Sequence, residues 1–291
     1  MDFNKYYEDR QQLVNAFLEK RLEKKGISRV DEAMAYSLLA GGKRIRPIIL
    51  MATADALGIS GYNFLPVACG LEMIHTYSLI HDDLPCMDDD EYRRGRLTNH
   101  KVFGEALALL AGDALLTLAF EVMLEQKNVP AEALVETVRE VAMCAGNFGM
   151  VGGQVIDLDS EGKQISEEEL RKLHAGKTGA LFIAAVRSGA RLSGATSEEL
   201  LALTKFADLL GLAFQITDDI LDVEGDAAQM GKAAHSDEKK HKSTYVTLYT
   251  LDGAKALAQK TVDEALSCLE IFGDNAEALR EITKMMCGRK S

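Results

Sequence analysis

Apolar residues recur along this chain at the three- and four-residue spacing of amphipathic helices, and no segment sustains the strict alternation of a half-buried strand. Only four prolines interrupt the pattern, and alanine, leucine, glutamate and lysine are abundant. We therefore predict an all-α fold. The chain has 291 residues without an internal repeat or a low-complexity linker, so we expect one domain that spans residues 1–291.

Capping boxes mark the starts of three expected helices, because a Ser, Thr or Asp is followed three residues later by Glu. The pairs are Ser166 with Glu169, Thr196 with Glu199, and Asp274 with Glu277. The most apolar run, residues 106–120, contains Asp113 and is predicted to be too short to span a bilayer. We expect this run to form a buried helix pair or a subunit interface.

The first acidic motif lies in residues 75–96, which read HTYSLIHDDLPCMDDDEYRRGR and hold six carboxylates within ten positions. Such crowding is destabilising unless positive charge lies among the carboxylates. Asp82 and Asp83 close an apolar run. The helix is predicted to end near Leu84, because Pro85 disfavours helical backbone at the residue before it. The bend would return Asp88 toward the aspartate pair. Taken alone, an acidic run of this kind is more often a solvated loop.

A second acidic motif lies far downstream in FQITDDILD, which contains Asp218, Asp219 and Asp222. Asp218 and Asp222 are four residues apart and share one helix face, among apolar neighbours that predict burial. Unpaired charge is costly to bury, and hard divalent cations such as Mg²⁺ bridge carboxylates to substrate phosphates. We therefore predict that the two motifs face each other across a cavity and hold Mg²⁺.

The overall composition limits the kinds of binding partner and the cellular compartment that we expect for this protein. A net charge of −12 argues against a nucleic-acid partner. Five cysteines are scattered without a metal-binding spacing, which is typical of reduced thiols in a cytoplasmic protein. The N-terminal residues lack the apolar stretch of a signal peptide, so we expect a soluble protein without a membrane span.

Basic residues near the acidic motifs are candidates for binding an anion. They are Lys43 and Arg46 in GGKRIRP, Arg93 and Arg94 after the first motif, and Lys177, Lys232 and Lys242 in glycine-containing or polar segments. The plainer interpretations are a solvated turn, internal neutralisation of the acids, and ordinary surface lysines. No P-loop is present, which argues against a nucleotide triphosphatase. Together with an apolar cavity, these groups suit a lipid-like diphosphate whose departure leaves a carbocation.

The matching stretches AYSLLAGGKRIRP, EMIHTYSLIHDDLPCMDDDEYRRG, HAGKTGALF and LGLAFQITDDILDVEG carry a family resemblance. On these the sequence resembles the trans-prenyl diphosphate synthases along essentially its whole length, most closely the bacterial farnesyl diphosphate synthases. The resemblance implies an orthogonal helix bundle around a deep central cavity, usually as a homodimer. It also implies condensation of isopentenyl diphosphate with dimethylallyl or geranyl diphosphate.

The resemblance implies a role for each matching residue. Asp82, Asp83, Asp88, Asp218, Asp219 and Asp222 would hold Mg²⁺ on the allylic diphosphate, which makes Asp82, Asp83 and Asp218 catalytic. Arg93, Lys177, Lys232 and Lys242 would contact the allylic diphosphate, and Lys43, Arg46, His75 and Arg94 would bind isopentenyl diphosphate. Lys177, Thr178 and Gln215 occupy positions that are expected to steady the allylic cation.

Product length is expected to depend on Tyr77 and Ser78, which lie five and four residues before Asp82, a little over one helical turn away. In the family that the chain resembles, a bulky residue at this place accompanies a farnesyl product. The plainer interpretation is an ordinary core tyrosine. One departure from the family pattern is the run Ala233-Ala234-His235 in the polar segment that contains Lys232.

Three alternatives remain open on the sequence. A geranylgeranyl diphosphate synthase of the same family is the nearest. A terpene cyclase shares the acidic motifs but usually lacks GGKRIRP, because it has no isopentenyl diphosphate to bind. A non-catalytic regulatory subunit or a structural cation-binding protein would be expected to have lost acidic or basic residues, whereas both sets are intact here.

Overall fold

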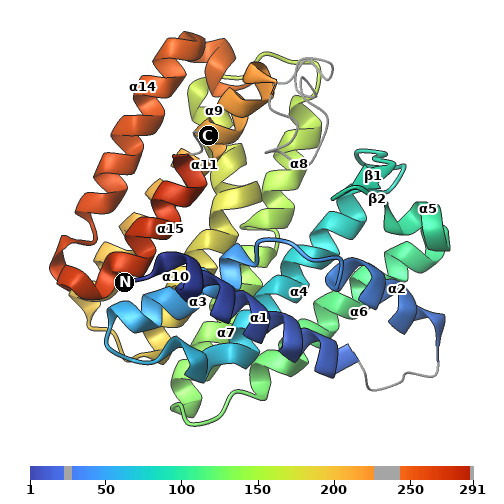
Figure 1. Cartoon of the computed structure of the whole chain (residues 1–291). Coiled ribbons are helices and arrows are strands. Elements are labelled where there is room, and N and C mark those ends of the chain that lie inside the picture. Colours follow the sequence, from blue (N-terminus) through green and yellow to red (C-terminus); the bar gives the residue numbers. More distant parts are fainter. Residues whose placement is uncertain (23–27, 226–242, 289–291) are drawn as a thin grey trace.

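Helices build nearly all of this computed structural model, which describes residues 1–22, 28–225 and 243–288 (Figure 1). In these ranges the only strands are β1 (Tyr92–Arg93) and β2 (Arg96–Leu97), which pair antiparallel as a hairpin after the first acidic motif. The all-α prediction is therefore confirmed. The segment that contains the hairpin cannot be helical, because Asp89, Arg94 and Gly95 have positive φ angles, which a right-handed helix does not allow.

The first half of the chain contains the elements that surround the acidic run. They are α1 (Phe3–Leu22), α2 (Arg29–Leu38), α3 (Ile45–Ala56), the 3₁₀ turn η1 (Gly61–Phe64), α4 (Leu65–Asp82), α5 (Asn99–Phe103), α6 (Glu105–Leu124) and α7 (Ala131–Ala145). The second half contains α8 (Met150–Ser160), α9 (Glu167–His174), the π-helical turn η2 (Ala175–Gly179), α10 (Ala180–Leu192), α11 (Ser197–Glu224), α14 (Tyr245–Ser267), the 3₁₀ turn η3 (Glu270–Ala276) and α15 (Glu277–Cys287).

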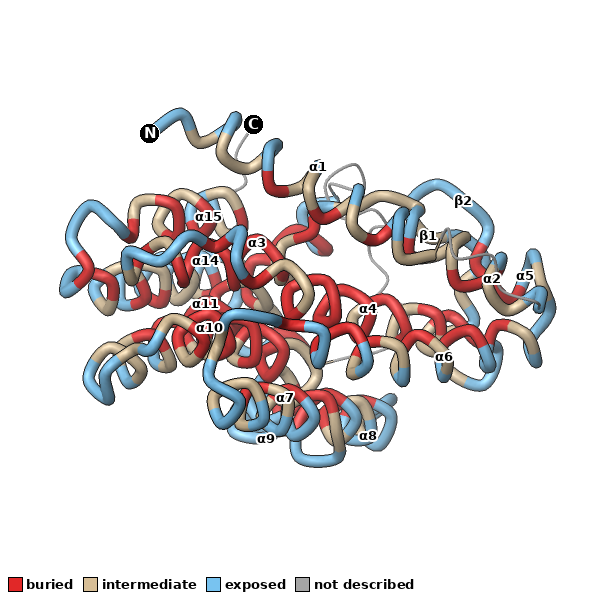
Figure 2. Tube along the Cα trace, turned by 90° about the horizontal axis from the view of Figure 1, so that it is seen from below, coloured by how far each residue is buried: buried red, intermediate tan, exposed pale blue. Residues whose placement is uncertain are grey.

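The core is organised around α4, which packs along α6 on one side and against α3 on another. Most of α4 is buried, and Leu71, Met73 and Ile74 are fully excluded from solvent. Helix α10 packs against α3, α7 and α11, and α11 packs in turn against α14. Figure 2 shows the buried positions concentrated in these inner helices, whereas α9 and the hairpin are more exposed. Since α4 and α11 carry the acidic motifs at their C-terminal ends, the core places both motifs.

Two of the three predicted capping boxes form as expected, at Ser166 before α9 and at Thr196 before α11. The third prediction is wrong, because α15 begins after Ala276, which provides no side-chain cap. Asp274 instead lies inside η3, where Gly273 has a φ of 52° and turns the chain directly into the helix. The backbone at Ala276 and Glu277 therefore follows a tight turn, and Asp274 does not occupy the capping position.

Helix α6 differs from its predicted form. The apolar run is not a helix pair but the centre of one helix of 20 residues, which follows the short α5. The predicted run, residues 106–120, lies inside this longer helix, and by length and composition alone α6 and α11 would each suffice to span a bilayer. That criterion is weak, since core helices of soluble proteins also meet it. Leu109 and Leu110 leave an apolar face of α6 exposed.

Candidate active site

The first acidic motif closes α4 in the way that the sequence predicted. Helix α4 ends at Asp82, before Pro85. The chain then turns back, so that the backbone N–H of Asp88 donates to the carbonyl oxygen of Asp82 over 2.9 Å. Burial raises the pKa of Asp82, and the negative charges of Asp88 and Asp83 raise it further, whereas the ammonium group of Lys177 opposes them. The predicted return of Asp88 toward the aspartate pair is therefore confirmed.

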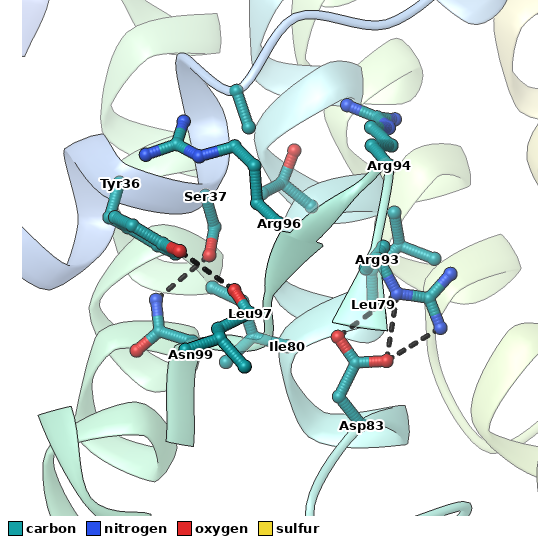
Figure 3. A pocket seen from close by; sticks show the side chains of 12 residues that line it. Tyr36, Ser37, Leu79, Ile80, Asp83, Arg93, Arg94, Arg96, Leu97 and Asn99 are labelled. Atoms are coloured by element: carbon teal, nitrogen blue, oxygen red, sulfur yellow. Dashed lines mark hydrogen bonds and ion pairs between the residues drawn. The ribbon is translucent and has the colours of Figure 1, made fainter. Parts of the chain in front are cut away.

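Asp83 is neutralised internally by Arg93 of the hairpin (Figure 3). The Nε of Arg93 donates to Oδ1 and Oδ2 at 2.7 and 2.9 Å, and its Nη2 lies 2.6 Å from Oδ1. Burial raises the pKa of Asp83, while this ion pair acts in the opposite direction. A paired guanidinium with two parallel contacts holds its partner firmly. This ion pair fixes the hairpin to the end of α4. To contact a ligand, Arg93 must either break the pair or bind Asp83 and the ligand together.

A pocket lies between α2, the end of α4 and the hairpin (Figure 3). Asp83 and three arginines line it, together with uncharged polar side chains. The lining includes Tyr36, Ser37, Thr76, Asp83, Arg93, Arg94, Arg96 and Asn99. The guanidinium of Arg96 stacks over the ring of Tyr36 at 4.3 Å, while Arg93 is paired with Asp83. The arginines therefore point to different partners rather than converging on one point in the pocket.

The second acidic motif is embedded in α11, where Asp219 and Asp222 are each 3% exposed. Asp219 is held at both oxygens: Oδ1 accepts from Nε2 of Gln215 at 3.2 Å, and Oδ2 accepts from the backbone N–H of Tyr245 at 2.7 Å. Gln215 accepts in turn from the hydroxyl of Thr178 at 3.3 Å. Side chains that the sequence separates by up to 67 positions thus form one network between η2, α11 and the start of α14.

Lys177 lies between the two halves of the site. Its Nζ donates to Oδ2 of Asp157 on α8 at 2.7 Å, and its charge lowers the pKa of Asp82 on α4. Helix α8 approaches so closely at Gly153 that a Cβ there would collide with the backbone of Lys177. Asp157 was not among the predicted site residues. Its position four residues after Gly153, on the same helix face, is the only sequence signal that could have identified it.

The candidate isopentenyl diphosphate residues gather on the other side of α4. Burial lowers the pKa of Arg46 to about 10, and its buried Nε has no hydrogen-bond partner among the described residues. Its guanidinium lies 5.0 Å from the ring centre of Phe182. Burial also lowers the pKa of His75 well below the ordinary value, and the nearby charges of Arg46 and Arg94 lower it further. This concentration of positive charge with an unsatisfied donor favours an anionic ligand.

Arg94 reaches this cluster from the hairpin and donates from Nη1 to the carbonyl oxygen of Gly41. Gly42 has a φ of 124°, and a Cβ at this position would lie 2.5 Å from Nη1 of Arg94. The backbone angle favours glycine here, and the absence of a side chain also lets the guanidinium of Arg94 approach the backbone. Lys43 follows and is exposed. The structure thus brings Lys43, Arg46, His75 and Arg94 to one region, whereas Lys232 and Lys242 lie outside the described residues.

Tyr77 and Ser78 lie on α4 between this cluster and the first motif. Tyr77 is 7% exposed, and its ring packs edge-on against His81 at 5.6 Å between centres. Burial raises the pKa of its hydroxyl, and the charge of Asp82 raises it further. The hydroxyl of Ser78 donates to the carbonyl oxygen of His75 at 2.9 Å. Tyr77 is therefore a buried aromatic side chain close to the acidic end of the helix, as its spacing predicted.

The donors of the two motifs suit Mg²⁺ in kind, because they are all carboxylate oxygens. Mutual repulsion and burial raise the pKa of Asp82, and a bound cation would relieve that repulsion. Within residues 1–22, 28–225 and 243–288, however, no three acidic, histidine or cysteine side chains are already clustered as a metal site. The carboxylates of the two motifs therefore fit Mg²⁺ by the chemistry of their donor atoms.

Comparison with known proteins gives a consistent result. The family model described as polyprenyl synthetase matches residues 27–286. The chain is 44% identical to farnesyl diphosphate synthase of Geobacillus stearothermophilus, over 99% of this chain and 98% of that one. It is also 44% identical to geranylgeranyl diphosphate synthase of Cyanophora paradoxa, over 98% and 96% of the two chains. An FPP/GFPP synthase structure from Zymomonas mobilis superposes with a TM-score of 0.89 at 36% identity, covering 98% of this chain and 99% of that chain.

His75 should make the protein less stable in mild acid. Its pKa in the folded state lies well below the ordinary value of 6.5, so the unfolded chain takes up a proton that the folded protein does not. The resulting loss of unfolding free energy begins as the pH falls through 6.5 and is absent above it. In His75→Gln, urea denaturation should show a shallower loss between pH 6.5 and 5, by up to about 1.4 kcal/mol per pH unit. The curves of variant and wild type should run parallel between pH 7 and 8. Equal slopes in the acid range would show that His75 is freely protonated in the folded protein.

Proposed function

The chain belongs to the polyprenyl synthetase family, and we propose that it is a prenyltransferase that condenses isopentenyl diphosphate with dimethylallyl or geranyl diphosphate to give farnesyl diphosphate. The observation that carries this proposal is the pair of opposite charge clusters along α4. Carboxylates lie at its C-terminal end, and Arg46 of α3 and Arg94 of the hairpin lie beside His75, which is two turns earlier on α4. One cluster suits a metal-bound diphosphate and the other a diphosphate held by cations, as a reaction between two diphosphates requires.

The proposed mechanism assigns each step to residues of the site. Mg²⁺ bound by Asp82, Asp83, Asp88, Asp218, Asp219 and Asp222 would neutralise charge on the allylic diphosphate as it leaves. The allylic C–O bond breaks, the isopentenyl double bond attacks the cationic carbon, and the proton that is lost passes to the released diphosphate. Asp219 already accepts two hydrogen bonds within the protein, so it contributes mainly negative charge and the anchoring of α14.

The remaining groups hold the substrates and the cation. Lys43, Arg46, His75 and Arg94 orient isopentenyl diphosphate, and Arg93, Lys177, Lys232 and Lys242 contact the allylic diphosphate. Thr178 and Gln215 offer oxygen dipoles to the allylic cation, and the ammonium group of Lys177 steadies it indirectly by holding the departing diphosphate close to it. The exchange of the Lys177–Asp157 pair for a diphosphate contact would place this lysine on the substrate. In that exchange Lys177 keeps an anionic partner, while Asp157 gives up its counter-charge to the ligand.

Geranylgeranyl diphosphate is the alternative product. It is supported by the similarity to the Cyanophora paradoxa protein, whose identity equals that to the Geobacillus stearothermophilus farnesyl diphosphate synthase. Tyr77 favours the shorter product, because a buried ring one turn before the acidic motif restricts the space for a growing chain. A terpene cyclase or a non-catalytic subunit would not need the intact cluster of Lys43, Arg46 and Arg94.

The active form is proposed to be a cytoplasmic homodimer. Helix α6 is apolar along its length, yet only 39% of its most apolar window is buried within the chain. Leu109 and Leu110 are 46% and 55% exposed, next to the half-exposed charge of Asp113. A second copy that packs on this face would bury these side chains from water. Cys69, Cys86, Cys144 and Cys268 are free thiols, which is consistent with a reducing compartment.

The function is tested by incubating the protein with Mg²⁺, geranyl diphosphate and isopentenyl diphosphate and analysing the chain length of the product. Activity should be lost with chelator and return with Mg²⁺. Asp82→Asn and Asp218→Asn should lower kcat by about a hundredfold or more, because the metal acts on charge that develops in the transition state. Asp89→Asn is the matched control in the same acidic run, since Asp89 is exposed and asparagine tolerates its positive φ. Near wild-type turnover in Asp82→Asn or Asp218→Asn would refute the metal assignment.

Product length is tested by Tyr77→Ala. Removal of the ring should lengthen the product by one or more isoprene units, measured by chromatography of the dephosphorylated alcohols. The cavity should also lower the unfolding free energy by about 3 kcal/mol or more. Tyr77→Phe keeps the ring and should keep the wild-type product. A folded, active Tyr77→Ala enzyme that still stops at the wild-type length would place the floor of the pocket elsewhere.

The dimer is tested by Leu110→Glu, which puts a charge on the exposed apolar face of α6. Sedimentation velocity should show a monomer for this variant and a dimer for the wild-type protein, because the charge would be desolvated in the interface. Leu201→Glu on α11 is the control, since Leu201 is 72% exposed and lies on a different helix. A Leu110→Glu protein that remains dimeric would assign the interface to another surface.

A further inference from the structure

The segment between α2 and α3, residues 41–44, carries Lys43 and leads into Arg46. Its backbone conformation is not favourable by itself. Gly41, Gly42 and Arg44 have φ angles of 81°, 124° and 52°. The positive φ of Arg44 is costly for a side chain other than glycine, and the surrounding structure must impose it. We call residues 41–44 the anchor loop. Its conformation decides where the cations that follow it point.

The contacts that impose this conformation come from α1. Tyr7, Gln11 and Asn15 are spaced four residues apart and therefore share one face of that helix. The Tyr7 hydroxyl donates to the carbonyl oxygen of Lys43. The Gln11 amide donates to the carbonyl oxygen of Gly42 at 2.8 Å. Asn15 accepts at Oδ1 from Nε of Arg44 at 2.9 Å. Three successive turns of α1 thus contact three successive residues of the anchor loop.

Arg44 connects this arrangement to α4. Its side chain is 1% exposed, and Nη1 donates to Oε1 of the equally buried Glu72 at 2.9 Å. Its Nη2 donates to the carbonyl oxygen of Leu38 at 2.8 Å, at the end of α2. Glu72 lies three residues before His75, on the adjacent turn of α4. The inward Arg44 therefore fixes the loop against the same helix that carries His75, and Lys43 is left on the outside.

Helix α1 is itself fixed in position by a separate, partly buried ion pair. Nη2 of Arg10 lies 2.6 Å from Oδ2 of Asp55 on α3, and the Tyr6 hydroxyl donates to the same oxygen at 2.5 Å. The guanidinium of Arg10 also stacks on the ring of Tyr6, 3.4 Å from its centre. These contacts prevent α1 from sliding along α3. The Tyr7, Gln11 and Asn15 face is therefore held in register with the anchor loop.

We propose that α1 is a positioning element for isopentenyl diphosphate binding, acting through Tyr7, Gln11, Asn15 and the buried Arg44–Glu72 pair. The inference rests on the proposed function of Lys43 and Arg46 as ligands of that diphosphate. None of the α1 side chains needs to touch the substrate. They keep the anchor loop in its binding conformation before the substrate arrives. The free energy of substrate binding is therefore not reduced by the conformational entropy lost when a loop becomes ordered. The effect is therefore specific to the second substrate.

The experiment uses Gln11→Leu, Asn15→Leu and the triple variant that adds Tyr7→Phe. These side chains are only half-buried, so the variants should fold. Each lost hydrogen bond should raise KM for isopentenyl diphosphate about three- to tenfold, with KM for geranyl diphosphate nearly unchanged. The melting temperature should stay nearly unchanged in Gln11→Leu and fall in Asn15→Leu, which leaves Nε of the buried Arg44 without its acceptor. Gln12→Leu is the matched control, because Gln12 is adjacent and exposed. Hydrogen–deuterium exchange over residues 41–46 should become faster in the variants and not in the control.

A second pair of variants separates positioning from stability. Glu72→Met alone leaves Arg44 buried without its partner and should lower the melting temperature. Arg44→Met combined with Glu72→Met replaces the ion pair by apolar side chains, so stability should return. KM for isopentenyl diphosphate should stay raised in the double variant, because the loop has lost its attachment to α4. Recovery of both properties together would show that the pair acts only on stability and would overturn this part of the proposal.

The outcomes distinguish this inference from the proposed function. If the wild-type protein does not condense isopentenyl diphosphate, the proposed function fails, and exchange over residues 41–46 with calorimetric binding of inorganic diphosphate still tests the α1 contacts. If the wild-type protein is active but the α1 variants leave exchange and KM unchanged, the positioning role is refuted. An equal rise of KM for both substrates would also refute it, because the effect would then be general rather than specific to the anchor loop.

Discussion

The cost of burying charge beside an apolar helix is the constraint on which the rest of this structure depends. Helix α4 is almost wholly buried and carries Glu72, His75 and the Asp82-Asp83 pair along its length. Each group must find a counter-charge or change its protonation, because water does not reach it freely. Arg44 meets Glu72, Arg93 meets Asp83, and His75 remains neutral among arginines. The α2–α3 loop and the hairpin are placed where these requirements are satisfied.

The same requirement connects stability to function. The pairs Arg93–Asp83 and Lys177–Asp157 neutralise carboxylates when only protein groups are present. In the proposed reaction, metal ions and diphosphate would take over these partners, so that charge balance is kept when substrate enters. A carboxylate network arranged in this way is stable without ligand and remains ready to bind one. This explains why the two acidic motifs need not form a closed cage within the described residues.

Helix α8 and helix α1 perform comparable supporting work on opposite sides of the site. Helix α8 approaches Lys177 through Gly153 and holds its ammonium group through Asp157. Helix α1 reaches the anchor loop through Tyr7 and Gln11. In both cases a helix without a proposed ligand-binding residue of its own fixes the backbone that presents such residues. Helices that provide no ligand-binding residue therefore also determine where the ligand-binding side chains lie.

The sequence by itself determined the helical class, two of the helix caps, the end of α4 before Pro85 and the helical face shared by Asp218 and Asp222. These features depend on neighbours within a few positions, where backbone geometry and side-chain spacing act directly. It also led to both acidic motifs and to the basic residues near them, since charge concentrated beside apolar runs is unusual. The capping box at Asp274 failed because Gly273 placed the turn differently, which its residue type permits but does not dictate.

Only the tertiary structure decided which charged groups meet. Asp157 with Lys177, Arg44 with Glu72, and Thr178 with Gln215 are pairings in which burial and packing select the partner. A lysine in a glycine-containing segment or an asparagine on an amphipathic helix has many possible partners along a chain. The close approach of α8 at Gly153 and of α1 at the anchor loop removes all but one of them. The residues that bind were therefore visible in the sequence, whereas the residues that hold them in place became visible only when the helices were packed together.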